Sequence, residues 1–252
     1  MTYLYPTTQV RVLAHRGLAI AANGDELDEN TMDAFERAVQ VGADYIESDI
    51  QVTADGVAVL FHDDDLKRVA GIDAPISGLS YSEVKAIKLR FGASIPSLKE
   101  ALSAFPKARF NLDFKVSGAI VPGAQVILEL QAQERILVAS FSESRRAAAA
   151  DLLPLAASSA GSTRVLGAYF GNLTGIKGLS AWATNAIQVL QIPIGQGPIH
   201  FDNRRFIDAM KRTNTEVHFW TINEPSEMLR LAKLGASGIV TDRADLALEA
   251  LR

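Results

Sequence analysis

Two short apolar runs of the sequence carry charged side chains at alternate positions. Glu47 and Asp49 are two residues apart in the first run, and Asn111, Asp113 and Lys115 alternate in the second. Side chains two residues apart on a strand face the same way. Two carboxylates on one buried face repel each other unless a proton or a cation lies between them, and oxygen ligands suit Mg²⁺ or Ca²⁺. The spacing predicts one divalent cation, with Mn²⁺ also compatible, bound by Glu47, Asp49 and Asp113; a salt bridge to Lys115 inside the fold is the alternative for Asp113.

Two histidines follow apolar runs. His15 precedes Arg16 and Gly17, and His62 ends the run at 57–61 and precedes Asp63. An imidazole moves protons near neutral pH, and a guanidinium offers a planar fork to phosphate. For the first pair taken alone, a structural histidine beside a surface arginine is the simpler interpretation. Together with Lys115, however, these groups suit an anionic phosphate substrate.

Other candidates are weaker. Trp220 lies in an apolar run and could pack against the apolar part of a substrate or belong to the core. Asp242 is best explained as a helix cap, and His200 and His218 have no neighbouring residues that suggest chemistry. We therefore expect His200 and His218 to be surface or structural residues.

The elements that must position these residues alternate between short strands and amphipathic segments, which is typical of a parallel α/β sheet. With 44–50 and 57–62 counted as a hairpin-like pair, eight strand positions remain in 252 residues. This favours a (β/α)8 TIM barrel, where catalytic residues lie at the carboxyl ends of the strands. The stretch 63–96 predicts a small insertion after the second strand region. The candidate strands are 10–15, 44–50, 57–62, 109–115, 136–141, 164–169, 187–192, 216–222 and 238–241. The candidate helices are 31–41, 81–88, 97–105, 121–132, 143–153, 174–184, 201–213, 225–234 and 243–251.

Composition narrows the function classes. There are 25 basic and 29 acidic residues and no cysteine, so the formal net charge is −4 and no thiolate site or disulfide exists. This balance argues against broad binding of nucleic acid. Between Asp25 and Asp65 there are 13 acidic residues and one base, Arg37. No secretory signal or membrane-spanning run is evident, so we expect a single domain over 1–252, a cytoplasmic location and no stable membrane association.

Several short motifs occur in one order along the chain, and this ordered set resembles the glycerophosphodiester phosphodiesterase family. The first four are Ala14-His-Arg-Gly17; Glu29-Asn-Thr31 with Ala34-Phe35 and Gly42-Ala-Asp44; Glu47-Ser-Asp49 with Thr53-Ala-Asp-Gly56; and His62-Asp63 with Leu66-Lys-Arg68. The later ones are Ile95-Pro-Ser-Leu98, Ser140-Phe141, Trp220-Thr-Ile-Asn223 and Gly238-Ile-Val-Thr-Asp242.

The resemblance implies an α/β barrel that uses a divalent cation to hydrolyse glycerophosphodiesters to sn-glycerol 3-phosphate and an alcohol. It implies the following roles: His15 and His62 as the acid–base pair, Glu47 and Asp49 on the metal, Arg16 and Lys115 on the phosphate, and Glu29 near the metal. The chain departs from the pattern at Asp113, where the family usually has Glu, and at Asp28, where it usually has Pro. The segment 18–28 is also longer and more acidic than expected.

Other functions compete with this one. A phospholipase-D-like barrel acting on lipid headgroups requires an apolar or basic rim, and the sequence shows no basic amphipathic helix. A non-catalytic barrel that binds a phosphate ligand would not require the two histidines. A sugar-phosphate isomerase or aldolase would usually require a Schiff-base lysine or a carboxylate base and not this set of residues. We expect a small-molecule phosphodiester as partner and leave the oligomeric state open.

Overall fold

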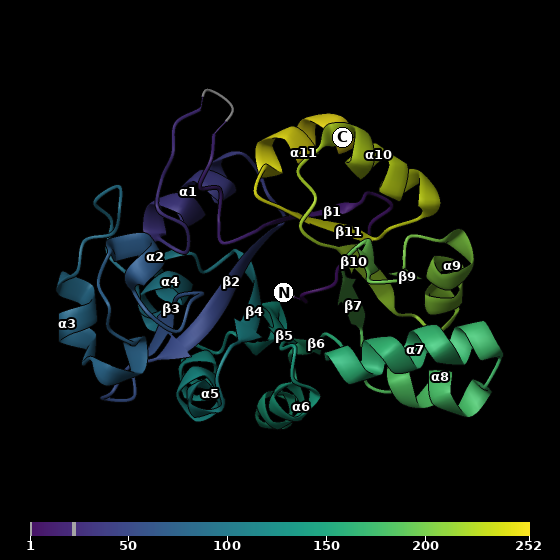
Figure 1. Cartoon of the computed structure of the whole chain (residues 1–252), viewed down its shortest axis with the longest axis horizontal. Helices are drawn as coiled ribbons and strands as arrows, with labels where there is room; N and C mark the ends of the chain where they lie inside the picture. Colours follow the sequence, from purple (N-terminus) through teal and green to yellow (C-terminus); the bar gives the residue numbers. More distant parts are fainter. Residues whose placement is uncertain (1, 22–23) are drawn as a thin grey trace.

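Eight parallel strands form a barrel in the computed structural model of the chain, which describes residues 2–21 and 24–252 (Figure 1). The barrel strands follow the order β6-β5-β4-β2-β1-β11-β10-β7, and each is parallel to the strands next to it in this order. This confirms the predicted fold class. The strands are β1 (Arg11–Ala14), β2 (Tyr45–Val52), β4 (Arg109–Phe114), β5 (Ile136–Ala139), β6 (Ala157–Ser158), β7 (Val189–Ile192), β10 (Glu216–Phe219) and β11 (Gly238–Thr241).

The two end strands of this order, β6 and β7, meet through a short seam. Ser159 and Val189 form one parallel bridge, and the backbone N–H of Ala160 donates to the carbonyl of Val189 at 2.9 Å. The N–H of Gln188 donates to the carbonyl of Ser158 at 3.0 Å. The barrel is therefore nearly closed.

Helices follow the strands and cover the outside of the barrel (Figure 1). Ser80 and Ser97 each begin a helix with a capping box, in which the serine hydroxyl and a glutamate three residues on satisfy free backbone N–H groups. None of the described helices is both long and apolar enough to cross a bilayer. The helices are α1 (Met32–Gln40), α2 (Lys67–Ala70), α3 (Tyr81–Ala86), α4 (Leu98–Ala104), α5 (Ile120–Glu129), α6 (Glu143–Leu152), α7 (Ser162–Thr174), α8 (Lys177–Thr184), α9 (Arg204–Arg212), α10 (Pro225–Leu234) and α11 (Ala244–Leu251), with short 3₁₀ turns η1 (Ile76–Gly78), η2 (Ser117–Ala119) and η3 (Gln133–Arg135).

The strands alternate between two environments. On β2, Ile46 and Ile50 belong to the large core between the strands and the helices. Tyr45 belongs instead to a second cluster inside the barrel, with Leu13 and Val240. Because side chains alternate along a strand, Glu47 and Asp49 share the inward face with Tyr45. The sequence pattern predicted this shared face.

One predicted strand is wrong. The segment 164–169 is part of α7, and the sixth barrel strand is the two-residue β6 at Ala157–Ser158. Helical packing outweighs the local β-like composition, because Val165 and Ala168 are buried on the same helix face. At Gly171, an added Cβ would lie 2.5 Å from the Ser180 hydroxyl, so α7 and α8 pack too closely for a larger side chain there. The predicted helix 174–184 begins later, after the left-handed Gly175.

The predicted insertion is confirmed. β3 (Ala58–Leu60) pairs antiparallel with β2, and α2, η1 and α3 follow before α4. This segment has its own small core, which includes Leu66, Ile76 and Ile95. Asp28 ties the insertion to the barrel, since its carboxylate accepts hydrogen bonds from the backbone N–H groups of Phe91 and Ala93. This contact gives a structural role to the residue that stands where the family usually has Pro.

Candidate active site

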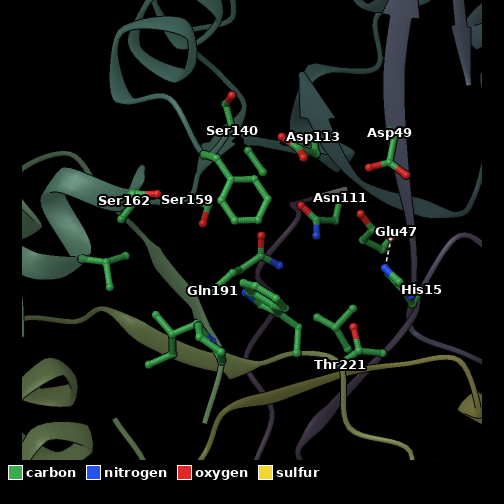
Figure 2. A pocket seen from close by; sticks show the side chains of 18 of the residues that line it. His15, Glu47, Asp49, Asn111, Asp113, Ser140, Ser159, Ser162, Gln191 and Thr221 are labelled. Atoms are coloured by element: carbon green, nitrogen blue, oxygen red, sulfur yellow. Dashed lines mark ion pairs between the residues drawn. The ribbon is translucent and has the colours of Figure 1, made fainter. Parts of the chain in front are cut away.

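A cavity of about 560 Å³ opens at the carboxyl ends of the barrel strands (Figure 2). Its volume is within the usual range for small-molecule sites. Eight of the nine residues for which the sequence predicted a catalytic, substrate or metal role line it: His15, Arg16, Glu47, Asp49, His62, Asp113, Lys115 and Trp220. Glu29, expected near the metal, is not in the described lining.

The carboxylates come together because β2 and β4 are in register. Glu47 pairs with Asn111 and Asp49 with Asp113, so four polar side chains from two neighbouring strands face the same cavity (Figure 2). All four are buried. The Lys115 ammonium lies 3.3 Å from Asp49 Oδ1 and 3.3 Å from Asp113 Oδ2. The salt bridge considered from the sequence is therefore present, within the cavity wall and shared by two carboxylates.

This group of acids carries more negative charge than its surroundings compensate. Burial and the charge of Asp49 raise the pKa of Glu47 to about 7. Burial also raises the pKa of Asp113, although Lys115 opposes the shift. A cation near these groups would favour their ionised forms.

The side-chain oxygen atoms of this group are ligands of the kind that a hard cation prefers. Asp113 Oδ1 and Asn111 Oδ1 are buried acceptor atoms with no hydrogen-bond partner among the described residues. Glu47 and Asp49 add further carboxylate oxygens, which Mg²⁺ and Ca²⁺ prefer. Within residues 2–21 and 24–252, no three His, Asp or Glu side chains are close enough together to hold a metal ion as they stand. The metal role of the three carboxylates therefore stays a prediction.

Asp242 holds His15 in place. His15 Nδ1 and Asp242 Oδ1 are 2.6 Å apart, and Asp242 Oδ2 accepts a hydrogen bond from Asn223 Nδ2 at 2.8 Å. The other imidazole nitrogen, Nε2, lies 3.9 Å from Glu47 Oε2 (Figure 2). Burial alone would lower the pKa of His15, but the bond to Asp242 and the charge of Glu47 raise it above its ordinary value. The expected helix-cap role of Asp242 is wrong: α11 begins after Arg243 with no side-chain cap, and the Asp242 carboxylate instead supports His15. Its place at the end of the last strand was the available signal.

A second carboxylate holds His62. His62 Nδ1 and Asp63 Oδ1 are 2.6 Å apart, and Asp63 Oδ2 accepts a hydrogen bond from Arg68 Nε at 2.7 Å. Arg68 and Arg16 both pair with Glu29 Oε1, at 2.5 and 2.9 Å. Glu29 thus links the two histidine regions, and its proximity to a metal stays a prediction.

A tight turn places Arg16 at the cavity. Its backbone N–H donates to Glu47 Oε2 at 3.0 Å, and its Nε lies 3.5 Å from Asp49 Oδ2. Gly17 has a φ of 82°, and an added Cβ would lie 2.8 Å from the carbonyl carbon of Ala34. Only glycine fits this turn without displacing α1.

The opposite wall of the cavity carries no charged side chain among its described residues. It comes from the region between β5 and β10 and combines apolar residues with small polar ones. Phe141 and Trp220 pack edge to face with ring centres 5.7 Å apart, and Lys115 lies 5.9 Å from the centre of the Phe141 ring. Gln191 Nε2 is a buried donor with no hydrogen-bond partner among the described residues, and no sequence pattern pointed to it. The small polar side chains in this wall are Ser140, Ser159, Ser162, Gln191 and Gln196.

The remaining two histidines lie outside the described lining of the cavity. His200 is exposed on the short hairpin of β8 (Gly195–Gln196) and β9 (Ile199–His200). His218 is fully buried, with Nε2 2.9 Å from Glu216 Oε2. These positions agree with the surface and structural roles expected for them.

Comparison with known proteins decides the family. The model of the Glycerophosphoryl diester phosphodiesterase family matches residues 15–246. The chain belongs to this family. It is 35% identical to "Probable glycerophosphodiester phosphodiesterase 2" of Mycobacterium tuberculosis over 240 aligned residues. The aligned region covers 95% of this chain and 89% of that protein. The present chain is therefore an enzyme of the phosphodiesterase class.

Solved structures agree on the fold of this phosphodiesterase. A phosphodiesterase of Oleispira antarctica, solved in complex with the product sn-glycerol-3-phosphate, superposes with a TM-score of 0.75 at 24% identity, over 96% of each chain. A glycerophosphodiester phosphodiesterase of Agrobacterium tumefaciens gives a TM-score of 0.75 at 22% identity, over 96% of this chain and 98% of that one.

Besides Asp28, the sequence departs from the family pattern in two further ways. Asp113 replaces the usual Glu and pairs with Lys115, which leaves its other oxygen free of hydrogen-bonding partners among the described residues. The segment 18–28 is acidic and includes residues 22 and 23, which lie outside the described residues; Ile20 and Glu26 form an antiparallel bridge across it.

Proposed function

We propose that this phosphodiesterase is metal-dependent and hydrolyses glycerophosphodiesters to sn-glycerol 3-phosphate and an alcohol, with His15 and His62 as its acid–base pair. One observation carries the proposal: two imidazoles, each held through Nδ1 by an aspartate, line one cavity with buried carboxylates and two basic side chains. Family membership and the Mycobacterium tuberculosis relative support the substrate class. The product complex of the Oleispira antarctica enzyme supports the expected product.

Arg16 and Lys115 are the groups that bind the phosphate. Both line the cavity, and both are held by carboxylates that restrict their positions. Fixed cationic donors stabilise charge that develops on phosphate oxygens during the displacement. Glu47, Asp49 and Asp113 would hold the divalent cation, which would supply further neutralisation of this charge when bound.

The two imidazoles move the protons. One accepts a proton from the attacking hydroxyl, which belongs either to water or to the 2-position of the glycerol, and the other donates a proton to the oxygen of the leaving alcohol. Attack by water gives sn-glycerol 3-phosphate directly, whereas attack by the 2-hydroxyl gives a cyclic phosphate that water then opens. With Nδ1 of each ring engaged by a carboxylate, Nε2 remains for proton exchange in the cavity. A barrel that only bound a phosphate ligand would not require two such pairs.

The test is direct. Purified protein, stripped of metal by a chelator, is incubated with glycerophosphocholine, glycerophosphoethanolamine and glycerophosphoglycerol, with and without Mg²⁺, Mn²⁺ or Ca²⁺. Release of sn-glycerol 3-phosphate that requires added metal supports the proposal. Absence of release from every substrate with every metal contradicts it.

A second candidate substrate is a monoacylated glycerophosphodiester. The cavity wall opposite the acids includes Phe141, Leu166 and Phe201, which could hold an acyl chain. The human relative "Lysophospholipase D GDPD1" is 27% identical over 91% of this chain and 82% of that protein. Choline release from lysophosphatidylcholine, compared with release from glycerophosphocholine, measures this preference.

The single domain and the cytoplasmic location stay predictions.

A further inference from the structure

Helix α7 and the turn that follows it expose a row of large apolar side chains that we call the α7 stripe: Leu166, Phe170, Leu173 and Ile176. Leu166, Phe170 and Leu173 are spaced at i, i+4 and i+7, which places them on one face of the helix. Ile176 follows at the tip of the α7–α8 hairpin, after Gly175. The four are 36%, 42%, 57% and 55% exposed. Single exposed apolar residues are ordinary, but a contiguous row marks an interaction surface.

The stripe faces outward because the rest of the helix is fixed. Val165 and Ala168 are buried in the core. Gly167 packs against Trp182 of α8, where an added Cβ would lie 2.8 Å from the ring. The two helices lie side by side and extend away from β6 (Figure 1). Rotation of α7 to bury the stripe would break these contacts.

The stripe begins at the catalytic cavity. Leu166 lines the cavity and is also its first member. Phe141, another exposed cavity residue, accepts a hydrogen bond on its backbone carbonyl from the N–H of Ser162, the first residue of α7, at 3.0 Å. An apolar band therefore runs from the cavity mouth along α7 to the hairpin tip.

The charge around the stripe differs from that of the chain as a whole. Residues 152–201 contain no Asp or Glu and two bases, Arg164 and Lys177, whereas the full chain has a net charge of −4. Lys177 is exposed beside Ile176 at the hairpin tip. The acid that approaches the start of α7, Glu143, is paired with Arg146 and Arg164 at 2.7 and 2.6 Å. An anionic surface would therefore meet no unpaired carboxylate from this hairpin.

We propose that the α7 stripe docks reversibly on a phospholipid surface and places the mouth of the phosphodiesterase cavity beside the headgroups. Apolar side chains on one helix face enter the boundary between headgroups and acyl chains, and a neighbouring lysine interacts with anionic headgroups. A second copy of the chain is a poorer occupant, because a protein seated on a stripe that starts at the cavity would crowd its entrance. The proposal rests on the proposed function only for the chemistry in the cavity.

The experiment compares two matched double variants. Phe170→Ser with Leu173→Ser removes the centre of the stripe. Val121→Ser with Leu128→Ser removes two apolar residues, 55% and 44% exposed, from α5. Each protein is sedimented with vesicles of phosphatidylcholine, with and without phosphatidylglycerol. We expect wild type and the α5 variant to bind, more strongly with phosphatidylglycerol, and the stripe variant to bind about tenfold more weakly.

Three results would overturn the docking proposal. Wild type could fail to bind either vesicle, both variants could lose binding equally, or light scattering could show a dimer that the stripe variant alone disrupts while no protein binds vesicles. Hydrolysis of soluble glycerophosphocholine, measured in parallel, is expected to be equal in all three proteins. Loss of that hydrolysis in wild type would contradict the proposed function and would leave the vesicle result to decide docking by itself.

Discussion

The imidazole of His15 and the carboxylate of Asp242 are 2.6 Å apart although 227 residues separate them in the chain. His15 directly follows β1, the first strand, and Asp242 directly follows β11, the last. These two strands pair in register from Arg11 with Gly238 to Ala14 with Thr241. The contact between His15 and Asp242 therefore forms only when the two ends of the chain come together in the barrel.

The first prediction tests this contact. Asp242→Asn should lower kcat by on the order of 10–10³-fold with a small change in KM, because the imidazole loses the charge that orients it and favours its protonated form. The matched control is Asp33→Asn, an exposed acid on α1. Steady-state kinetics and thermal melting of both variants provide the measurement. An equal fall of Tm and kcat in both, or a change confined to KM in Asp242→Asn, would argue against a positioning role.

The second prediction concerns the histidines themselves. His15→Ala and His62→Ala should each reduce kcat by about 10²–10⁴-fold, since general acid–base catalysis contributes on this scale. His200→Ala should leave kcat unchanged, because His200 is exposed outside the described cavity lining. A loss in His200→Ala as large as in the other two would show that the proton-transfer groups are wrongly assigned.

The third prediction separates metal binding from phosphate binding. Asp113→Ala should weaken Mg²⁺ binding in a calorimetric titration, because it removes a buried oxygen that has no hydrogen-bond partner among the described residues. Asp113→Glu, which restores the usual residue of the family, should bind Mg²⁺ at least as tightly as wild type. Lys115→Ala should raise KM and lower kcat with little change in metal affinity. Equal Mg²⁺ affinity of wild type and Asp113→Ala would remove Asp113 from the metal site.

The local pattern of the sequence was sufficient to predict which side chains form much of this site. Alternation along one strand predicted that Glu47 and Asp49 face the same way, and the barrel fold predicted that strand ends such as His15 and His62 share one mouth. Pairing across the barrel was not predictable in this way, because the register of Asp49 with Asp113 and the contact of His15 with Asp242 depend on tertiary structure.

The sixth strand shows where local reasoning fails. β6 has two residues, one of them Ser158, so it has neither the length nor the apolar alternation by which strands are recognised. The more apolar segment 164–169 next to it gave a stronger strand signal, but its buried residues recur at helical spacing. Propensity was outweighed by the packing of α7 against α8.

The fourth prediction concerns stability in acid. Hydrogen bonds from His218 and Arg11 outweigh the effect of burial and lower the pKa of Glu216 to about 2, from an ordinary value of 4.5. The folded state thus favours the ionised carboxylate, so its stabilisation is complete above pH 4.5 and is lost as the pH falls from there through about 2. We expect the loss to be on the order of 2 kcal/mol.

Urea denaturation of wild type and Glu216→Gln across this pH range measures the effect. The variant should be less stable at neutral pH and should lose less stability as the pH falls. Glu36→Gln, an exposed substitution on α1, should follow wild type. Parallel stability curves for wild type and Glu216→Gln would contradict the assignment.

The most direct test of metal-dependent catalysis by the two histidines is release of sn-glycerol 3-phosphate from glycerophosphocholine by metal-stripped protein, before and after Mg²⁺ is restored. The double variant His15→Ala with His62→Ala is assayed beside it. If a divalent cation and the two histidines carry the reaction, there is no release before metal is restored, release afterwards, and none from the double variant under either condition. Equal release with and without the chelator, or release by the double variant at the wild-type rate, would contradict it.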